Sequence, residues 1–265
     1  MTMKKIYIFI ITLVTISFCS HASIIAFDDS SDSVYDSGFG YQNGGTGFTG
    51  WLWGGDWWTG LFEPYVYHAG KLIDSDTRGN RGFRVFSHDG YKVHSSRSFS
   101  SSLNQDDMFS MNLGHIGGND GTLHFAILAN SNPILELELI SGSSSWRAWD
   151  GEYFDLNDEN GFANYSTTDN EDAEFTFTYH GGTSYGFSLT DGAGNGYHLA
   201  SKNASSAPNS MNSINRFSFK SEDQGINNEF YIDNLQIEAI PEPASVSFMA
   251  LTGSFLLFLR KRYRI

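Results

Sequence analysis

The sequence predicts an all-β protein whose domain is an antiparallel β-sandwich of the jelly-roll type, with about a dozen strands. In many short runs apolar residues alternate with polar ones, which is the pattern of strands buried on one face. Turn sequences rich in glycine, asparagine and aspartate separate these runs. No interior window of the sequence keeps a helical period over several turns, so the domain is predicted to contain strands and loops.

The alternating runs are spread through the middle of the chain. Their apolar positions are Phe83 and Val85; Phe109, Met111 and Leu113; Leu135, Leu137 and Leu139; Phe175, Phe177 and Tyr179; and Phe217 and Phe219. Two further runs, 122–129 and 229–240, are apolar on both faces, which predicts strands in the middle of a sheet. A tight turn is predicted at Gly181-Gly182, and the Ser/Asn-rich stretch 201–213 is predicted to be a loop.

The first 22 residues have the pattern of a signal peptide. Lys4 and Lys5 precede an almost wholly apolar stretch, and Ser20-His21-Ala22 follows with small residues at the two positions that a signal peptidase reads. Cleavage is expected after Ala22, which removes Cys19, the single cysteine. An uncleaved N-terminal anchor or a lipoprotein modified at Cys19 are the alternatives.

The charge between the two ends is strongly negative. Six of the 16 Lys and Arg residues and none of the 30 Asp and Glu residues lie in residues 1–22 and 244–265, so the chain between them carries 10 − 30 = −20. A field of this sign excludes nucleic acid as a partner, because phosphate binding needs positive charge. Calcium, cationic surfaces and neutral glycans remain open.

The C-terminal end has three parts in a fixed order. They are Pro241-Glu242-Pro243, an apolar stretch at 244–259, and the basic residues Arg260, Lys261, Arg262 and Arg264. As a helix, the apolar stretch of 16 residues reaches about 24 Å, somewhat short of the roughly 30 Å of a bilayer core. The basic residues after it predict a cytoplasmic tail and an exported domain, with only transient insertion in the membrane.

This arrangement resembles the PEP-CTERM sorting signal of Gram-negative bacteria. The resemblance implies recognition by an exosortase, a membrane protease that processes the chain near the Pro-Glu-Pro motif, in a host that makes extracellular polysaccharide. An ordinary single-span anchor is the alternative.

The mature N-terminus resembles a type that recurs in the same group. Ala26-Phe27-Asp28-Asp29 is followed by a Tyr-x-x-Gly…Asn-Gly-Gly-x-Gly-Phe…Trp run at 35–51, and an Asp-Asn-Leu strand stands near the end at 231–235. The resemblance implies a jelly-roll sandwich like those of concanavalin or carbohydrate-binding modules, with no assigned biochemical role.

A cluster of tryptophans suggests a glycan-binding surface. Trp53, Trp57 and Trp58 are the candidates, because exposed aromatic faces stack on sugar rings. The alternative is that the cluster belongs to the core, with Trp51 and Trp53 on one inward strand face.

Glu136 and Glu138 are a candidate catalytic pair. They project from one strand face, about 6–7 Å apart. The run resembles the Glu-x-Asp-x-x-Glu strand of laminarinase-like glucanases, but Glu138 stands in place of the Asp and Ser141 in place of the last Glu. A solvated strand face is the simpler interpretation, and no catalytic residue is predicted.

A structural calcium ion is the one cofactor that the sequence suggests. Asp28 and Asp29 near the first strand and Asp233 in the last strand are the candidate ligands, because calcium prefers several carboxylate oxygens.

These observations predict three segments: a signal peptide at 1–22, a β-sandwich at 23–240 and a sorting signal at 241–265. The protein is predicted to be a non-catalytic component of the cell surface or the extracellular matrix. Binding of a glycan is a possible part of this role. Signal peptidase and exosortase are the expected partners during export, with extracellular polysaccharide as the candidate ligand. The alternative is a jelly-roll glycan hydrolase with a degenerate catalytic strand.

Overall fold

The protein was analysed as a computed structural model. It describes residues 22–29, 32–37, 41–55, 82–86, 92–116, 122–140, 146–156, 173–191, 196–204, 211, 213–222 and 229–240. The domain is one compact unit at Ile24–Glu238, and the second unit, Met1–Ser23 with Ala239–Ile265, lies almost wholly outside the described residues.

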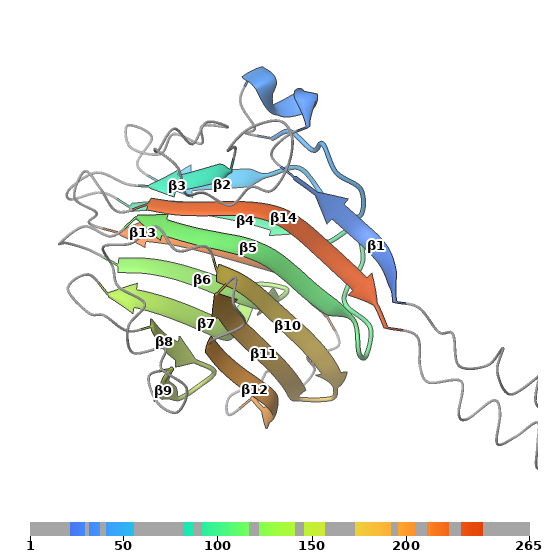
Figure 1. Ribbon diagram of the computed structural model, residues 1–265, viewed down its shortest axis with the longest axis vertical. Helices are drawn as coiled ribbons and strands as arrows, with labels where there is room; N and C mark the ends of the chain where they lie inside the picture. The colour runs from blue at the N-terminus through green and yellow to red at the C-terminus, as the bar shows by residue number, and fades with distance from the viewer. Residues whose placement is uncertain are drawn as a thin grey trace, which may run out of the picture. The chain divides into compact units, whose positions relative to one another are not determined.

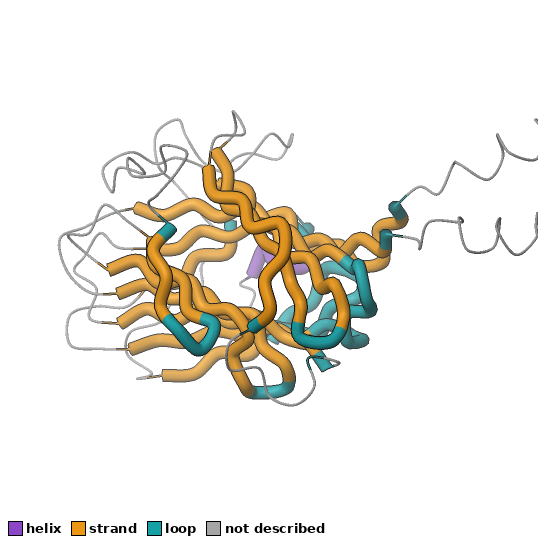
Figure 2. Tube along the Cα trace, turned by 90° about the horizontal axis from the view of Figure 1, so that it is seen from below, coloured by secondary structure: helices purple, strands orange, loops and turns teal. Residues whose placement is uncertain are grey.

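Fourteen strands and one short 3-10 helix make up the described structure. The strands are β1 (Ser23–Asp28), β2 (Leu52–Gly55), β3 (Phe83–Phe86), β4 (Lys92–Ser98), β5 (Met108–Ile116), β6 (Thr122–Ala129), β7 (Asn132–Ile140), β8 (Trp146–Trp149), β9 (Tyr153–Asp155), β10 (Ala173–Gly181), β11 (Ser184–Asp191), β12 (Gly196–Asn203), β13 (Ile214–Glu222) and β14 (Glu229–Ala239). The helix, η1 (Ser33–Ser37), is drawn in purple in Figure 2.

The strands form two antiparallel sheets that pack face to face (Figure 1). We call the sheet with the order β1-β14-β5-β10-β11-β12, in which β3 also pairs with β14, the back sheet, although it is the one nearer the viewer in Figure 1. The front sheet has the order β2-β4-β13-β6-β7-β8-β9. The first and last strands are therefore neighbours, and the chain crosses between the sheets several times.

The alternating patterns are confirmed as strands with one buried face. In β10, Phe175, Phe177 and Tyr179 are buried while Thr176 and Thr178 are half-buried. The two runs that are apolar on both faces became central strands: β6 lies between β13 and β7, and β14 between β1 and β5. Gly181 and Gly182 form the predicted turn with φ of 91° and 61°.

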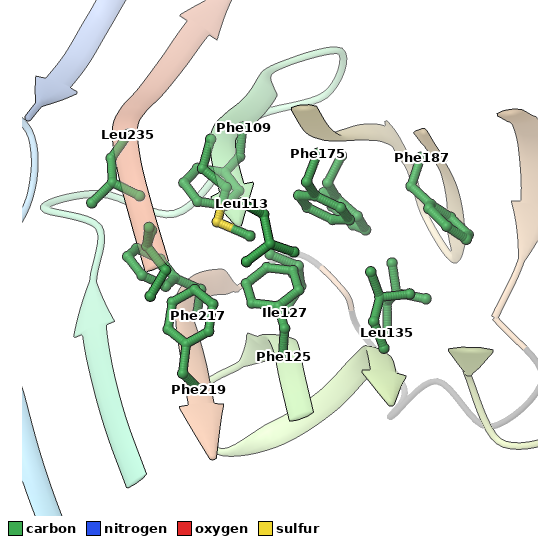
Figure 3. Packing of buried hydrophobic residues seen from close by; sticks show 14 of the residues in the cluster. Phe109, Leu113, Phe125, Ile127, Leu135, Phe175, Phe187, Phe217, Phe219 and Leu235 are labelled. Carbon is green, nitrogen blue, oxygen red and sulfur yellow. The ribbon is translucent and has the colours of Figure 1, made fainter. Parts of the chain in front are cut away.

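Aromatic side chains from the two sheets meet in the core (Figure 3). Phe109 of the back sheet stacks on Phe217 of the front sheet with ring centroids 5.1 Å apart. Phe175 and Phe125 meet edge to face at 4.7 Å. Each fully buried phenylalanine stabilises the fold by about 1.5–3 kcal/mol relative to an exposed one, so these contacts are a main reason why the two sheets stay together.

The sequence patterns missed some elements. Strand β4 was not predicted, because its inward face carries Ser95 and Arg97, which look polar in the sequence. The loop predicted at 201–213 begins too early, since β12 continues to Asn203. The helical segment of the described residues is the short 3-10 helix η1 at Ser33–Ser37, which leaves the all-β class unchanged.

The predicted signal peptide up to residue 21 and the sorting signal at 241–265 lie outside the described residues. Within the part of the chain that the structure describes, no helix has the length and apolar character needed to cross a bilayer.

Candidate functional site

The outer face of the front sheet carries the two glutamates singled out in the sequence. In β7, Leu135 and Leu137 point into the core, and Glu136 and Glu138 are half-buried on the opposite side. The prediction that the two carboxylates share one strand face is therefore confirmed.

Strand pairing gives each glutamate a basic partner. Glu138 lies opposite Arg147 of β8, and Arg147 Nη2 donates to Glu138 Oε2 at 2.5 Å. His124 of β6 lies on the other side of β7, with its Nδ1 2.6 Å from Glu136 Oε1. Both carboxylates thus take part in cross-strand pairs, which hold their side chains in defined positions.

Two aromatic side chains continue this face toward the sheet edge. The Arg147 guanidinium lies 5.0 Å from the centroid of the Tyr153 ring, and Tyr153 is 64% exposed. Trp149 is half-buried and lies between Glu136 and Tyr153 in the strand register.

We call His124, Glu136, Glu138, Arg147, Trp149 and Tyr153 the outer-face network. It combines the Glu138–Arg147 ion pair and the Glu136–His124 hydrogen bond with an exposed aromatic ring that lies in cation–π contact with Arg147. The outer face of the back sheet differs at its centre, where the short hydroxyl side chains of Ser110, Thr176 and Ser188 lie side by side in the register.

A second charged cluster is fully buried around Arg97 of β4. The Arg97 side chain is 0% exposed, pairs with Asp28 and Asn43, and donates from Nε to the Thr49 carbonyl at 2.7 Å. Its guanidinium lies 4.9 Å from the centroid of the Phe48 ring. This cluster ties the N-terminal segment to the front sheet.

Tyr35 completes the cluster from η1. Its hydroxyl donates to Asp28 Oδ2 at 2.6 Å and accepts from the Gly44 backbone N–H at 2.8 Å. Burial raises the pKa of Tyr35, so the phenol stays protonated and remains a donor. Burial also raises the pKa of Asp28, while Arg97 and the Tyr35 hydroxyl oppose that rise.

The Arg97 cluster explains the N-terminal run of glycines and aromatics. A Cβ at Gly45 would lie 2.2 Å from the Phe27 carbonyl oxygen, and Gly47 has φ of +75°. Trp51 is buried and lies 5.2 Å under the Arg97 guanidinium. The motif therefore describes how the chain wraps around one buried cation.

The tryptophans predicted to bind glycan are only partly placed. Trp53 lies in β2 opposite Ser95 in the register, and nothing is described of its side chain. Trp57 and Trp58 lie outside the described residues. The predicted inward position of Trp51 is confirmed.

The candidate calcium ligands lie near the two chain ends. Asp28 Oδ2 is already engaged by Arg97 and Tyr35, and Asp29 follows directly after β1. Asp233 is buried at a register shift of β14, where Asn234 has φ of 50°. Across the described ranges, no three His, Cys, Asp or Glu side chains form a group that could hold a metal ion. The calcium ion stays a prediction.

The sorting-motif residues are not part of the described structure. Pro241, Glu242, Pro243, Arg260, Lys261 and Arg262 all lie beyond residue 240.

Sequence reasoning missed Arg97 and most of the outer-face network. The alternation in Trp146-Arg147-Ala148-Trp149 was a usable signal, because it places Arg147 and Trp149 on the same face. The register that puts them beside Glu138 and Glu136 comes only from the structure.

Comparisons with known proteins gave structural likeness alone. No family model matches the chain, and no curated protein matches it. A carbohydrate esterase of the Shiga toxin-encoding bacteriophage phi24B aligns at 13% identity with a TM-score of 0.47, over 83% of this chain and 99% of that one. A Bauhinia forficata lectin solved with GalNAc aligns at 11% identity and TM-score 0.42, over 82% and 98%.

A Caenorhabditis elegans galectin aligns at 11% identity and TM-score 0.34, over 52% of this chain and 85% of the galectin. These values are low, so a function for this chain has to be argued from its own residues.

Proposed function

We propose that the β-sandwich is a non-catalytic glycan-binding domain that uses the outer-face network, and that it is exported to the cell surface or the extracellular polysaccharide matrix of a Gram-negative bacterium. The observation that carries the binding proposal is the position of Arg147, which bonds Glu138 and lies over the exposed ring of Tyr153.

This geometry suits a sugar ring. Aromatic faces pack against the C–H groups of a ring, and ionised side chains form strong hydrogen bonds to hydroxyl groups. Because the pairs Glu138–Arg147 and Glu136–His124 already order these side chains, little conformational entropy is lost when a ligand binds.

The export part of the proposal is supported by the two ends of the sequence. The signal-peptide pattern at 1–22 and the three-part C-terminus at 241–265 favour processing by signal peptidase and an exosortase. Mass spectrometry of the mature protein from its native host tests this. A protein that begins at Ser23 and lacks Arg260–Ile265 is expected; an intact C-terminus would contradict exosortase processing.

A glycan array tests the binding proposal. Wild-type protein is expected to bind at least one glycan, and Trp149→Ala and Tyr153→Ala should each lose most of that binding. Phe27→Ala is the matched control, because Phe27 is 39% exposed on β1 of the other sheet. If Trp149→Ala and Tyr153→Ala both still bind the glycan but Trp53→Ala, Trp57→Ala or Trp58→Ala does not, the binding site is the tryptophan cluster and not the outer-face network.

A glycan hydrolase is the second candidate, because Glu136 and Glu138 do share one partly exposed strand face. Release of reducing ends from polysaccharides, lost in Glu136→Gln, would favour the hydrolase. Absence of any release by the wild-type protein across substrates that bind on the array would end it.

The calcium ion has its own test. If Asp28, Asp29 and Asp233 hold a structural calcium, the melting temperature should rise when calcium is added after chelation. Equal melting temperatures with calcium and with chelator would remove the ion from the proposal.

A further inference from the structure

One row of residues crosses the whole outer face of the front sheet. Successive strand registers place these residues side by side: Leu52, Ser96, Ser218, Ala126, Glu136, Trp149 and Tyr153. Ser96, Ser218 and Ala126 are among the shortest side chains available, Glu136 follows them, and the two ends are apolar or aromatic. We call this the short-side-chain row.

Longer side chains flank the middle of the short-side-chain row on both sides. On one side the register aligns His94, Lys220, His124, Glu138 and Arg147. On the other side Arg216 pairs with Leu128 and bonds the Ser98 hydroxyl at 3.1 Å. Ser218 and Ala126 are therefore shorter than the side chains that flank them on both sides in the register, and Ser96 is shorter than His94.

The row is long compared with one sugar. It spans seven strands, and at about 4.8 Å between neighbouring strands its six intervals reach roughly 29 Å. A ligand that follows the row lies across the strands and is extended.

The charges beside the row are compensated. Glu138 is paired with Arg147 and Glu222 with both Lys92 and Lys220, while Glu136 is hydrogen-bonded to the His124 ring, so three carboxylates lie beside three lysine and arginine cations. Lys220 and Lys92 hold the pKa of Glu222 below its usual value despite its partial burial. Glu222 is therefore ionised at neutral pH, and its contacts with the two lysines are ion pairs. A face without a large excess of either sign favours an uncharged ligand rich in hydroxyl groups.

From these observations we infer that the ligand is a linear, neutral polysaccharide, bound along the short-side-chain row through an internal segment of its chain. Sugar rings stack at the Trp149–Tyr153 end, the chain passes over Ser218 and Ala126, and it reaches Leu52, which is 45% exposed. This inference rests on the proposed glycan-binding function and adds the class and the binding mode of the ligand.

The test measures affinity against ligand length. Cello-, xylo-, manno- and laminari-oligosaccharides, from disaccharides to octasaccharides, are titrated into the full mature domain by calorimetry. For the series that binds, affinity is expected to rise by about tenfold or more between trisaccharide and hexasaccharide, because more of the row is occupied. Equal affinity at all lengths would overturn the binding along the row.

Two variants locate the ligand. Ser218→Trp fills the middle of the row and should weaken hexasaccharide binding by at least about tenfold, whereas Ser188→Trp on the back sheet should not. Leu52→Asp changes a side chain that is 45% exposed, and should weaken binding of the longest oligosaccharides while leaving binding of trisaccharides unchanged. Unchanged hexasaccharide binding in both Ser218→Trp and Leu52→Asp would contradict the inference.

The possible failures are distinct. If no glycan binds at all, the proposed function itself fails. If glycans bind through Trp149 and Tyr153 without dependence on length, only the present inference fails. Preference for polymers of uronic acids over neutral ones would overturn the neutral class.

Discussion

Two arginines of this domain make nearly the same contacts in opposite environments. Arg97 lies 4.9 Å from the Phe48 ring and pairs with Asp28, while Arg147 lies 5.0 Å from the Tyr153 ring and pairs with Glu138. The side chain of Arg97 is 0% exposed and that of Arg147 is 36% exposed. The chemistry is shared, so the difference in burial separates their roles.

Burial makes the Arg97 cluster unreachable for ligands and makes the loss of either charge costly for stability. A buried charge that loses its partner is left without water, which costs several kcal/mol. An exposed pair contributes about 0–1 kcal/mol to stability, because water screens it, but its groups can still contact a ligand. The comparison therefore predicts large stability effects at Arg97 and binding effects at Arg147.

The largest effect is expected for Asp28→Asn. The substitution keeps the shape but removes the negative charge facing Arg97, and the free energy of unfolding should fall by about 3–5 kcal/mol. Urea unfolding measures this. Glu138→Gln removes the charge that faces the partly exposed Arg147, is the matched control and should cost less than about 1 kcal/mol. Similar losses in the two variants would show that burial does not separate the clusters.

Tyr185→Phe is expected to have an effect on stability between those of Asp28→Asn and Glu138→Gln. Tyr185 of the back sheet donates to Asp150 Oδ2 at 2.7 Å, and Lys202 Nζ lies 2.8 Å from the same oxygen. Asp150 directly follows Trp149, so this contact joins the β8–β9 hairpin to the other sheet. Since Lys202 remains as a partner, the loss should be about 1.5–3 kcal/mol.

Thermal unfolding of Tyr185→Phe and of Tyr153→Phe, which alters only an exposed hydroxyl, checks this expectation. Equal melting temperatures for the two variants would mean that the hydroxyl of Tyr185 contributes nothing to the fold.

The smallest effect concerns pH. Because Lys220 and Lys92 lower the pKa of Glu222 below its ordinary value of 4.5, the folded state binds a proton at this group less readily than the unfolded state does. The contribution of Glu222 to the free energy of unfolding is fully present above pH 4.5 and is lost as the pH falls through the lowered pKa. The difference in melting temperature between wild type and Glu222→Gln should therefore shrink in acid; a difference that grows in acid would contradict the assignment.

The strands of this domain could be predicted because their signal is local. Phe175, Phe177 and Tyr179 show a buried face within five residues of sequence, and β10 formed there. Arg97 gives no such signal. It lies in a strand of polar residues, and its partner Asp28 is 69 positions away.

The candidate site was predictable only in part for the same reason. The spacing of Glu136 and Glu138 predicts that they share one strand face. Their contacts with His124 and Arg147 depend on how three strands are aligned, which the sequence does not show. Trp149 and Tyr153 were not singled out, because tryptophans and tyrosines fill cores as readily as surfaces and burial depends on the final packing.

The proposed role of the outer-face network is tested most directly by one titration of Arg147→Met with the best-binding glycan of the array. The substitution keeps most of the side-chain volume and removes the guanidinium that joins Glu138 to Tyr153. Affinity is predicted to fall at least about tenfold, equivalent to ~1.4 kcal/mol, in a protein that melts close to the wild-type temperature. An unchanged affinity for the same glycan would contradict the assignment of the binding site to this face.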